Sequence, residues 1–301
     1  MTEQFVRKME EGVKLLGIQL SEKQLEQFYD YFQFLVEKNK VMNLTAITEE
    51  DAVITKHFCD SLCLVKGFSD IEKTVSLIDV GTGAGFPGIP LKITFPHLKV
   101  TLLDSLNKRV RFLEEVCERL DLENVTCVHA RAEDGGRNKD LREKFDLCVS
   151  RAVANLSSLS EYCMPFVKVG GYFVPYKSGD IEEELAQAKK AVAILGGEIE
   201  NVTGFELPGG EGSRSLNRFQ QNIQEKRDFQ EKSHWEQNEH EIGYMQMKNT
   251  YLSDYYIKYA LKIRLFSLPL RSETSETIKC SDNKSNNKIK RYIKKKAECK
   301  L

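Results

Sequence analysis

The sequence predicts an α/β fold in which a doubly wound parallel sheet follows a helical N-terminal extension. From about residue 75 to residue 216, short apolar runs alternate with amphipathic stretches, a pattern typical of βαβ units. The first apolar run leads into a turn with three glycines, and most runs end in polar residues. These observations predict three regions: a helical extension (1–67), a sheet domain (68–216) and an atypical tail (217–301).

The N-terminal extension has the periodicity of amphipathic helices. Ser21 and Gln24 have the spacing of a capping box, which predicts a helix start. Thr48 with Asp51 is a weaker signal for a second helix, on which His57 would lie. From the residues alone, a packing or surface role is favoured for His57. The apolar residues expected on one face of the first helix are Leu25, Phe28, Phe32, Leu35 and Val36.

The glycine-rich turn lies within residues 77–88 and predicts a strand, a tight loop and a helix start. Gly81, Gly83 and Gly85 allow sharp turns and the close approach of a ligand to the backbone. The spacing D-x-G-x-G-x-G is shorter than the dinucleotide fingerprint G-x-G-x-x-G, which disfavours a nicotinamide oxidoreductase. Asp79 before the loop suits the ammonium group of S-adenosylmethionine better than it suits a pyrophosphate. A purely structural turn is the alternative.

A second predicted strand, 101–104, also ends in an acid. Asp104 follows the loop by about 20 residues, the distance at which a ribose diol is bound in nucleotide sites of this kind. The alternative for Asp104 is a solvated acid that caps the next helix. Further strands are predicted over residues 75–80, 125–129, 145–149 and 171–176, with a sixth over 198–207. The polar residues at the strand ends should share one rim of the sheet: Asp79, Asp104, Glu133, Arg151 and Lys177.

Composition limits the classes of function. The 301 residues carry 44 Lys and Arg against 45 Asp and Glu, so any surface for nucleic acid must be local. The N-terminus has no basic head followed by an apolar run, and no apolar stretch is long enough to span a bilayer. We therefore expect a cytoplasmic protein without membrane contact. None of the eight cysteines forms a C-x-x-C pair, so we expect core residues and no metal site.

Several motifs together resemble the GidB (RsmG) family, the bacterial methyltransferases for guanine N7 in the 530 loop of 16S ribosomal RNA. The most specific is the run D-V-G-T-G-A-G-F-P-G-I-P from Asp79 to Pro90. The resemblance covers roughly residues 1–216. The supporting motifs are Asn43-Leu44-Thr45, Lys56-His57 with Asp60-Ser61, Leu103-Asp104-Ser105, Lys108-Arg109, Ala132-Glu133, Ser150-Arg151-Ala152 and the segment 170–177.

The resemblance implies a class I (Rossmann-like) methyltransferase sheet, with S-adenosyl-L-methionine as cofactor and 16S ribosomal RNA or the small ribosomal subunit as partner. Asp104 would bind the ribose, and Ala132 and Glu133 would meet the adenine. Arg151, the implied catalytic residue, would close the site beside the sulfonium or the incoming base. The implied cofactor-binding positions are Asp79, Gly81, Gly83, Phe86, Asp104, Ala132, Glu133 and Arg151.

Guanine N7 carries a lone pair and no proton, so methyl transfer to it depends on positioning more than on a general base. An arginine is unexpected beside a cationic sulfonium. We therefore expect Arg151 to contact RNA or to be held by an acid such as Asp79, with a structural ion pair as the alternative. Phe86, at the tip of the loop, is expected to cover the cofactor. The basic residues expected to bind RNA phosphates are His57, Lys108, Arg109 and Lys177.

The resemblance stops after Leu216. Residues 217–240 are polar, and from Ser272 onward the composition is typical of disorder. The abrupt change suggests a frameshifted or misassembled C-terminus, with a lineage-specific extension as the alternative. The expected consequence is loss of the antiparallel strand beside the fifth strand, which would open a sheet edge. A non-catalytic cofactor or RNA binder is therefore one alternative function, and a methyltransferase of the same fold that acts on a small molecule is another.

Overall fold

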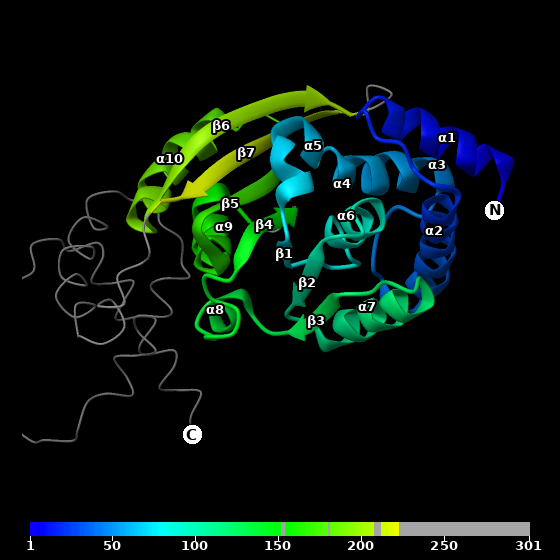
Figure 1. The fold of residues 1–301 in the computed structure, drawn as a ribbon, viewed down its shortest axis with the longest axis horizontal. Helices are drawn as coiled ribbons and strands as arrows, with labels where there is room; N and C mark the ends of the chain where they lie inside the picture. The colour runs from blue at the N-terminus through cyan, green and yellow to red at the C-terminus, as the bar shows by residue number, and fades with distance from the viewer. Residues whose placement is uncertain (152–153, 180, 208–211, 223–301) are drawn as a thin grey trace, which may run out of the picture. The chain divides into compact units, whose positions relative to one another are not determined.

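Seven strands form one sheet in the computed structural model, which describes residues 1–151, 154–179, 181–207 and 212–222 (Figure 1). Their order across the sheet is β3-β2-β1-β4-β5-β7-β6. The strands are β1 (Ser76–Val80), β2 (Lys99–Asp104), β3 (Val125–His129), β4 (Phe145–Arg151), β5 (Val167–Ser178), β6 (Gly197–Glu206) and β7 (Ser213–Gln221).

The direction of winding reverses beside β1, which pairs in parallel with β2 on one side and with β4 on the other. In register, Leu77 lies between Val100 and Leu147. A reversal of this kind leaves room for a ligand at the carboxyl ends of the strands. β7 is antiparallel to both β5 and β6. The prediction of a class I methyltransferase sheet is confirmed.

Helices cover both faces of this sheet, because successive strand residues point to opposite sides. Leu77 belongs to the first core and Ile78 to the second. The helices on the first face are α1 (Glu3–Lys14), α2 (Glu22–Met42), α3 (Glu50–Val53), α4 (Asp60–Leu62), α5 (Leu64–Gly67), α6 (Gly88–Thr94) and α7 (Asn107–Arg119). Those on the second face are α8 (Ala132–Gly135), α9 (Leu156–Cys163) and α10 (Glu182–Ile194) (Figure 1).

The N-terminal helices pack their apolar face directly on the sheet core. Ser21 forms the predicted capping box, since its hydroxyl accepts from the Gln24 N–H at 3.3 Å and the Gln24 side chain accepts from the Ser21 N–H at 2.8 Å. The Gln24 amide also donates to the Ile93 carbonyl at 2.8 Å, which ties α2 to the end of α6. The predicted cap at Thr48 is wrong: α3 begins at Glu50, after Glu49, without a side-chain cap.

Short irregular turns connect these helices. The turn η1 (Ile54–Cys59) is π-helical, whereas η2 (Ser69–Lys73) and η3 (Met164–Phe166) are 3₁₀ turns. A π-helical turn shifts every following residue around the helix axis relative to a regular α-helix. It therefore decides which way the residues of α4 face, beginning with Asp60. Four cysteines are buried as predicted for core residues: Cys59, Cys63, Cys148 and Cys163.

The predicted loss of the strand beside β5 is wrong. β7 continues across the predicted boundary at residue 216 as far as Gln221 and lies between β5 and β6. Phe219 pairs in register with Phe173 on one side and with Ile199 on the other, and it is fully buried. Hydrogen bonding to two neighbouring strands stabilises a segment whose polar composition did not resemble a strand. The other predictions for the tail, from residue 223 onward, lie outside the described residues.

Candidate functional site

The glycine-rich loop joins β1 to α6 at the carboxyl edge of the sheet. Its three glycines have positive φ angles of 73° at Gly81, 62° at Gly83 and 102° at Gly85, a conformation that side chains with a Cβ rarely adopt. The Gly81 N–H donates to the Leu103 carbonyl at 2.8 Å, so the loop folds over the end of β2. A Cβ placed on Gly83 would meet no protein atom within 4 Å, which leaves one side of the loop open to a ligand.

Asp79 lies at the end of β1, directly under the loop, and is fully buried. One carboxylate oxygen, Oδ2, accepts from the Thr82 hydroxyl at 2.6 Å and from the Gly88 N–H at 2.8 Å. The other, Oδ1, is buried without a hydrogen-bond partner among the described residues. Burial raises the pKa of Asp79 to about 6, and the two hydrogen bonds act in the opposite direction. A buried oxygen of this kind can accept from a cationic donor such as an ammonium group.

Asp104, at the end of β2, connects the loop to α7. Its Oδ2 accepts from the Gly83 N–H at 2.9 Å, and its Oδ1 accepts from the Leu106 N–H at 2.8 Å. The guanidinium of Arg109 lies 3.5 Å from Oδ2. Asp104 thus fixes the backbone just before α7 and the open side of the loop; it is buried and gives α7 no side-chain cap, so the alternative of a solvated capping acid is wrong. A carboxylate has about four lone-pair positions, so acceptor sites are left for a diol.

Ala132 and Glu133 form the first turn of α8, which follows β3, and both are half-buried. Since β3 is the neighbour of β2, these residues continue the row of polar strand ends beyond Asp104. The predicted rim therefore exists from β1 to β3. On the other side of β1, the rim continues with Arg151 at the end of β4 and Lys177 near the end of β5.

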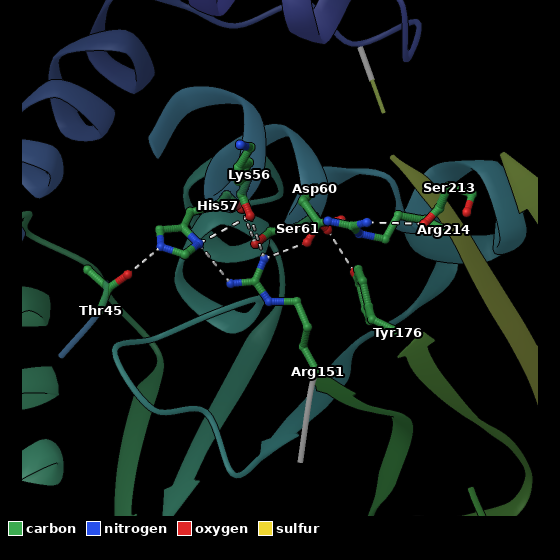
Figure 2. Close-up of polar contacts among 9 residues, drawn as sticks. All are labelled: Thr45, Lys56, His57, Asp60, Ser61, Arg151, Tyr176, Ser213 and Arg214. Carbon is green, nitrogen blue, oxygen red and sulfur yellow. Dashed lines mark hydrogen bonds and ion pairs between the residues drawn. The ribbon is translucent and has the colours of Figure 1, made fainter. Parts of the chain in front are cut away.

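Arg151 is held from several sides by residues of η1 and α4 (Figure 2). Its Nη1 donates to Asp60 Oδ2 at 2.7 Å and to the Lys56 carbonyl at 3.2 Å. Its Nη2 lies 3.3 Å from His57 Nδ1, and the guanidinium lies 5.1 Å from the ring centre of Phe86. The acid that pairs with Arg151 is therefore Asp60, whereas the sequence prediction named Asp79. Asp79 is instead buried beneath the glycine-rich loop, where its Oδ2 accepts from the Thr82 hydroxyl and the Gly88 N–H.

Phe86 and His57 stack on each other, with ring centres 4.5 Å apart and planes inclined by 20°. Phe86 is buried between this histidine and Tyr31 of α2, whose ring centre is 5.5 Å away. The Nε2 of His57 lies 2.8 Å from the Thr45 hydroxyl. Burial lowers the pKa of His57 to about 4, and the charge of Arg151 acts in the same direction. His57 is thus neutral at pH 7, packs as predicted from the residues alone, and brings no positive charge to RNA.

The remaining predicted basic residues lie on α7 and β5. Lys108 is exposed on the first turn of α7, beside Arg109. Lys177 pairs with Glu184 at 2.8 Å and donates to the Ala154 carbonyl at 3.0 Å, so its charge is partly neutralised. An open cavity of about 460 Å³ lies beside Lys108. Its lining consists of Met42, Asn107, Lys108, Arg111, Phe112 and Glu115.

Sequence reasoning gave no role to four residues that the structure places around this site. Tyr31 packs on the loop, Thr45 contacts His57, and Asp60 and Arg214 form ion pairs near Arg151. Thr45 and Asp60 stood in the motifs that carry the resemblance, but spacing along the chain did not show their partners. Tyr31 and Arg214 had no local signal, because their contacts join elements far apart in sequence.

The described residues contain no group of three or more His, Cys, Asp and Glu side chains placed to hold a metal ion. In the same residues, no helix combines the length and the apolar character that crossing a membrane requires.

A family model and individual related proteins both match this chain and point to the same family. The model of the GidB family, described as rRNA small subunit methyltransferase G, matches residues 24–216. Ribosomal RNA small subunit methyltransferase G of Lachnoclostridium phytofermentans is 54% identical over 206 residues, which cover 68% of this chain and 85% of that protein. Its counterpart in Bacillus subtilis is 51% identical over 205 residues, with 68% and 85% covered.

Solved structures show a more distant likeness. The O-methyltransferase from Bacillus cereus in complex with SAH has a TM-score of 0.46 and 15% sequence identity, covering 64% of this chain and 91% of that one. The family match begins within α2, ends within β7 and includes the glycine-rich loop, both strand-end acids and Arg151. The chain therefore belongs to the GidB family.

Proposed function

We propose that this chain transfers the methyl group of S-adenosyl-L-methionine to N7 of a guanine in the 530 loop of 16S ribosomal RNA. The observation that carries the proposal is the pair of carboxylates, Asp79 and Asp104, beside the open side of the loop at Gly83. Membership of a family described as rRNA small subunit methyltransferase G supports the reaction and the substrate class. A substrate in the ribosome also supports a cytoplasmic location.

The residues present fit the cofactor. The partnerless Oδ1 of Asp79 would accept from the ammonium group, and the open side of Gly83 would admit the methionine chain. Asp104 would bind the ribose hydroxyls, and Ala132 with Glu133 would contact the adenine. Bound S-adenosyl-L-methionine supplies an electrophilic methyl group on a sulfonium. Two acidic side chains in a site of low dielectric constant favour such a cationic ligand.

The acceptor side needs no general base, since guanine N7 has no proton to lose. The protein's contribution is to hold the base in line with the methyl group and to exclude alternatives. Arg151 can do this with its guanidinium, whose pairing with Asp60 reduces its repulsion of a sulfonium. Lys108 and Arg109 on α7 would contact the RNA backbone.

The test is methyl transfer to small-subunit RNA from a strain that lacks the modification. Purified protein, radiolabelled S-adenosyl-L-methionine and either naked 16S RNA or assembled subunits are combined at several salt concentrations. We expect label in the 530 loop, and none in an RNA whose target guanine is replaced by adenine. Absence of transfer to both substrates at every salt concentration would overturn the proposal.

The same assay separates the alternatives. Calorimetry that detects S-adenosyl-L-methionine binding without any transfer to RNA would support a non-catalytic binder. Transfer to small metabolites, with none to RNA, would support a small-molecule methyltransferase.

A further inference from the structure

Asp60 is a buried carboxylate that contacts two arginines at once, each with a different oxygen (Figure 2). Asp60 as a whole residue is only 3% exposed to solvent. Oδ2 accepts from Arg151 Nη1 at 2.7 Å, and Oδ1 accepts from Arg214 Nε at 3.0 Å. Arg151 ends β4, whereas Arg214 is the second residue of β7. One side chain therefore links the site arginine to the antiparallel part of the sheet.

The helix that carries Asp60, and the helix that follows it, are fixed against the same strands. In α4, the Ser61 carbonyl accepts from the Tyr176 hydroxyl of β5 at 2.7 Å. In α5, Gly67 packs so closely on β7 that a Cβ there would lie 2.8 Å from Leu216 Cβ. Arg214 itself lies in register with Ser178 of β5. The position of Asp60 is thus determined from two sides, and a rigid support of this kind can hold a partner side chain in one orientation.

The charges in this group do not balance. Two guanidinium groups, neither of which can lose its proton in a protein, share one carboxylate. The side chain of Arg151 is 14% exposed and that of Arg214 is 22% exposed, so water screens them weakly. Without the carboxylate, the two arginines would repel each other. Among the described residues, Arg151 would then keep only the Lys56 carbonyl and His57 as polar partners.

We propose that Asp60 is a positioning residue for methyl transfer: it orients Arg151 toward the acceptor base, and Arg214 makes that orientation depend on β7. This inference rests on the proposed function, because Arg151 is taken to face the bound RNA. It assigns Asp60 no direct contact with either substrate. Its effect must therefore pass through Arg151.

The test compares Asp60→Asn, Arg214→Gln, the double variant and a matched control. The control is Arg218→Gln, which removes the same type of residue from the same strand. Arg218 pairs with Glu200 at 2.7 Å and lies over the Tyr172 ring, away from Asp60. For each variant, calorimetry with S-adenosyl-L-methionine counts the folded sites, and kcat and KM for RNA are then expressed per folded site.

We expect Asp60→Asn to lower kcat by about 10- to 100-fold, the scale of a catalytic group displaced by about 1 Å, with cofactor affinity within about twofold of wild type. Arg214→Gln should lower kcat by a smaller factor, Arg214→Lys should restore part of it, and Arg218→Gln should leave it unchanged. If Arg214 acts through Asp60, Arg214→Gln has no further effect in the Asp60→Asn background. The inference would be overturned if the losses of kcat in the two single variants multiplied in the double variant, or if kcat were unchanged in both single variants.

A readout independent of activity separates this inference from the proposed function. In crystal structures, the Arg151 guanidinium should lie over the Phe86 ring in the wild type and should be displaced from it in Asp60→Asn. If the wild type fails to methylate RNA but Arg151 is displaced in Asp60→Asn, the proposed function is refuted and the positioning of Arg151 by Asp60 is retained. If the wild type methylates RNA but Arg151 does not move in the variant, the positioning role of Asp60 is refuted. If Asp60→Asn does not fold, Arg214→Gln and Arg214→Lys carry the same comparisons.

Discussion

The hydroxyl of Tyr31, on α2, donates a hydrogen bond to the backbone carbonyl of Ala84 in the glycine-rich loop. Both residues are buried, and the Tyr31 ring also packs, tilted, against the ring of Phe86. The N-terminal helices therefore do more than cover the sheet. They also support the backbone of the loop at Ala84.

Replacing Tyr31 by Phe tests this support. The ring contacts are kept, but the Ala84 carbonyl loses its partner, which should cost about 1–2 kcal/mol of stability. We expect weaker S-adenosyl-L-methionine binding by several-fold in calorimetry, because the loop is held less firmly. The matched control is Tyr29→Phe on the same helix, whose ring packs on Phe5. Equal cofactor affinities in the two variants would contradict the supporting role of Tyr31.

The raised pKa of Asp79 predicts that the affinity for the cofactor depends on pH. Its folded-state pKa, about 6, lies above that of the unfolded chain, so protonation stabilises the fold. That stabilisation is fully present below the unfolded pKa and is lost as pH rises through about 6. Binding of an ammonium group requires the ionised form, so affinity should weaken as pH falls below 6, by up to about tenfold per pH unit. Calorimetry between pH 5 and 7.5 should show this slope in the wild type, and an equal slope in Asp79→Asn would refute it.

Asp104 should govern both donor affinity and the loop. An asparagine there keeps one acceptor oxygen and loses either the Gly83 or the Leu106 hydrogen bond. A hydrogen bond to a charged group contributes about 1.5–3 kcal/mol, so we expect S-adenosyl-L-methionine affinity to fall by roughly 10- to 100-fold. The exposed Asp140→Asn serves as the control. Unchanged affinity in Asp104→Asn would show that this acid only holds the backbone at Gly83 and Leu106 and does not bind the donor.

The buried Asn217 side chain suggests a substitution in β7 that should raise the stability of the protein. Its side chain is fully buried, and neither its nitrogen nor its oxygen has a hydrogen-bond partner among the described residues. An unsatisfied buried amide costs about 1–3 kcal/mol, so Asn217→Val should raise the melting temperature by several degrees. The same substitution at the exposed Asn201 of β6 should not. A melting temperature that Asn217→Val leaves unchanged or lowers would contradict this prediction.

Lys108 should contribute to RNA binding mainly through phosphate contact. Lys108→Ala is expected to weaken binding of 16S RNA and to reduce the slope of log affinity against log salt by about 1. Lys99→Ala removes another exposed lysine, at the start of β2 and thus at the edge of the sheet opposite to Asp104, and should leave the slope unchanged. Filter binding over a range of salt concentrations measures both. Identical slopes for the two variants would place the RNA elsewhere.

The sequence by itself determined the local features of this protein. The alternation of strands and helices, the capping box at Ser21, the glycine-rich loop and the acids Asp79 and Asp104 were all readable from periodicity and turn chemistry. Each of these depends on residues within a few positions of one another, where the backbone geometry of a helix, strand or turn imposes a fixed spacing. Strand ends also meet at one edge of a parallel sheet, which is why the rim could be predicted.

Only the tertiary structure decided what holds Arg151 and whether the last strand forms. Asp60 lies 91 residues from Arg151 and 154 from Arg214, and the π-helical turn before it breaks the regular periodicity. β7 forms because β5 and β6 supply hydrogen bonds on both sides, although its own composition is polar. Ion pairs and strand pairing between distant segments depend on how whole elements pack, and spacing along the chain does not record this.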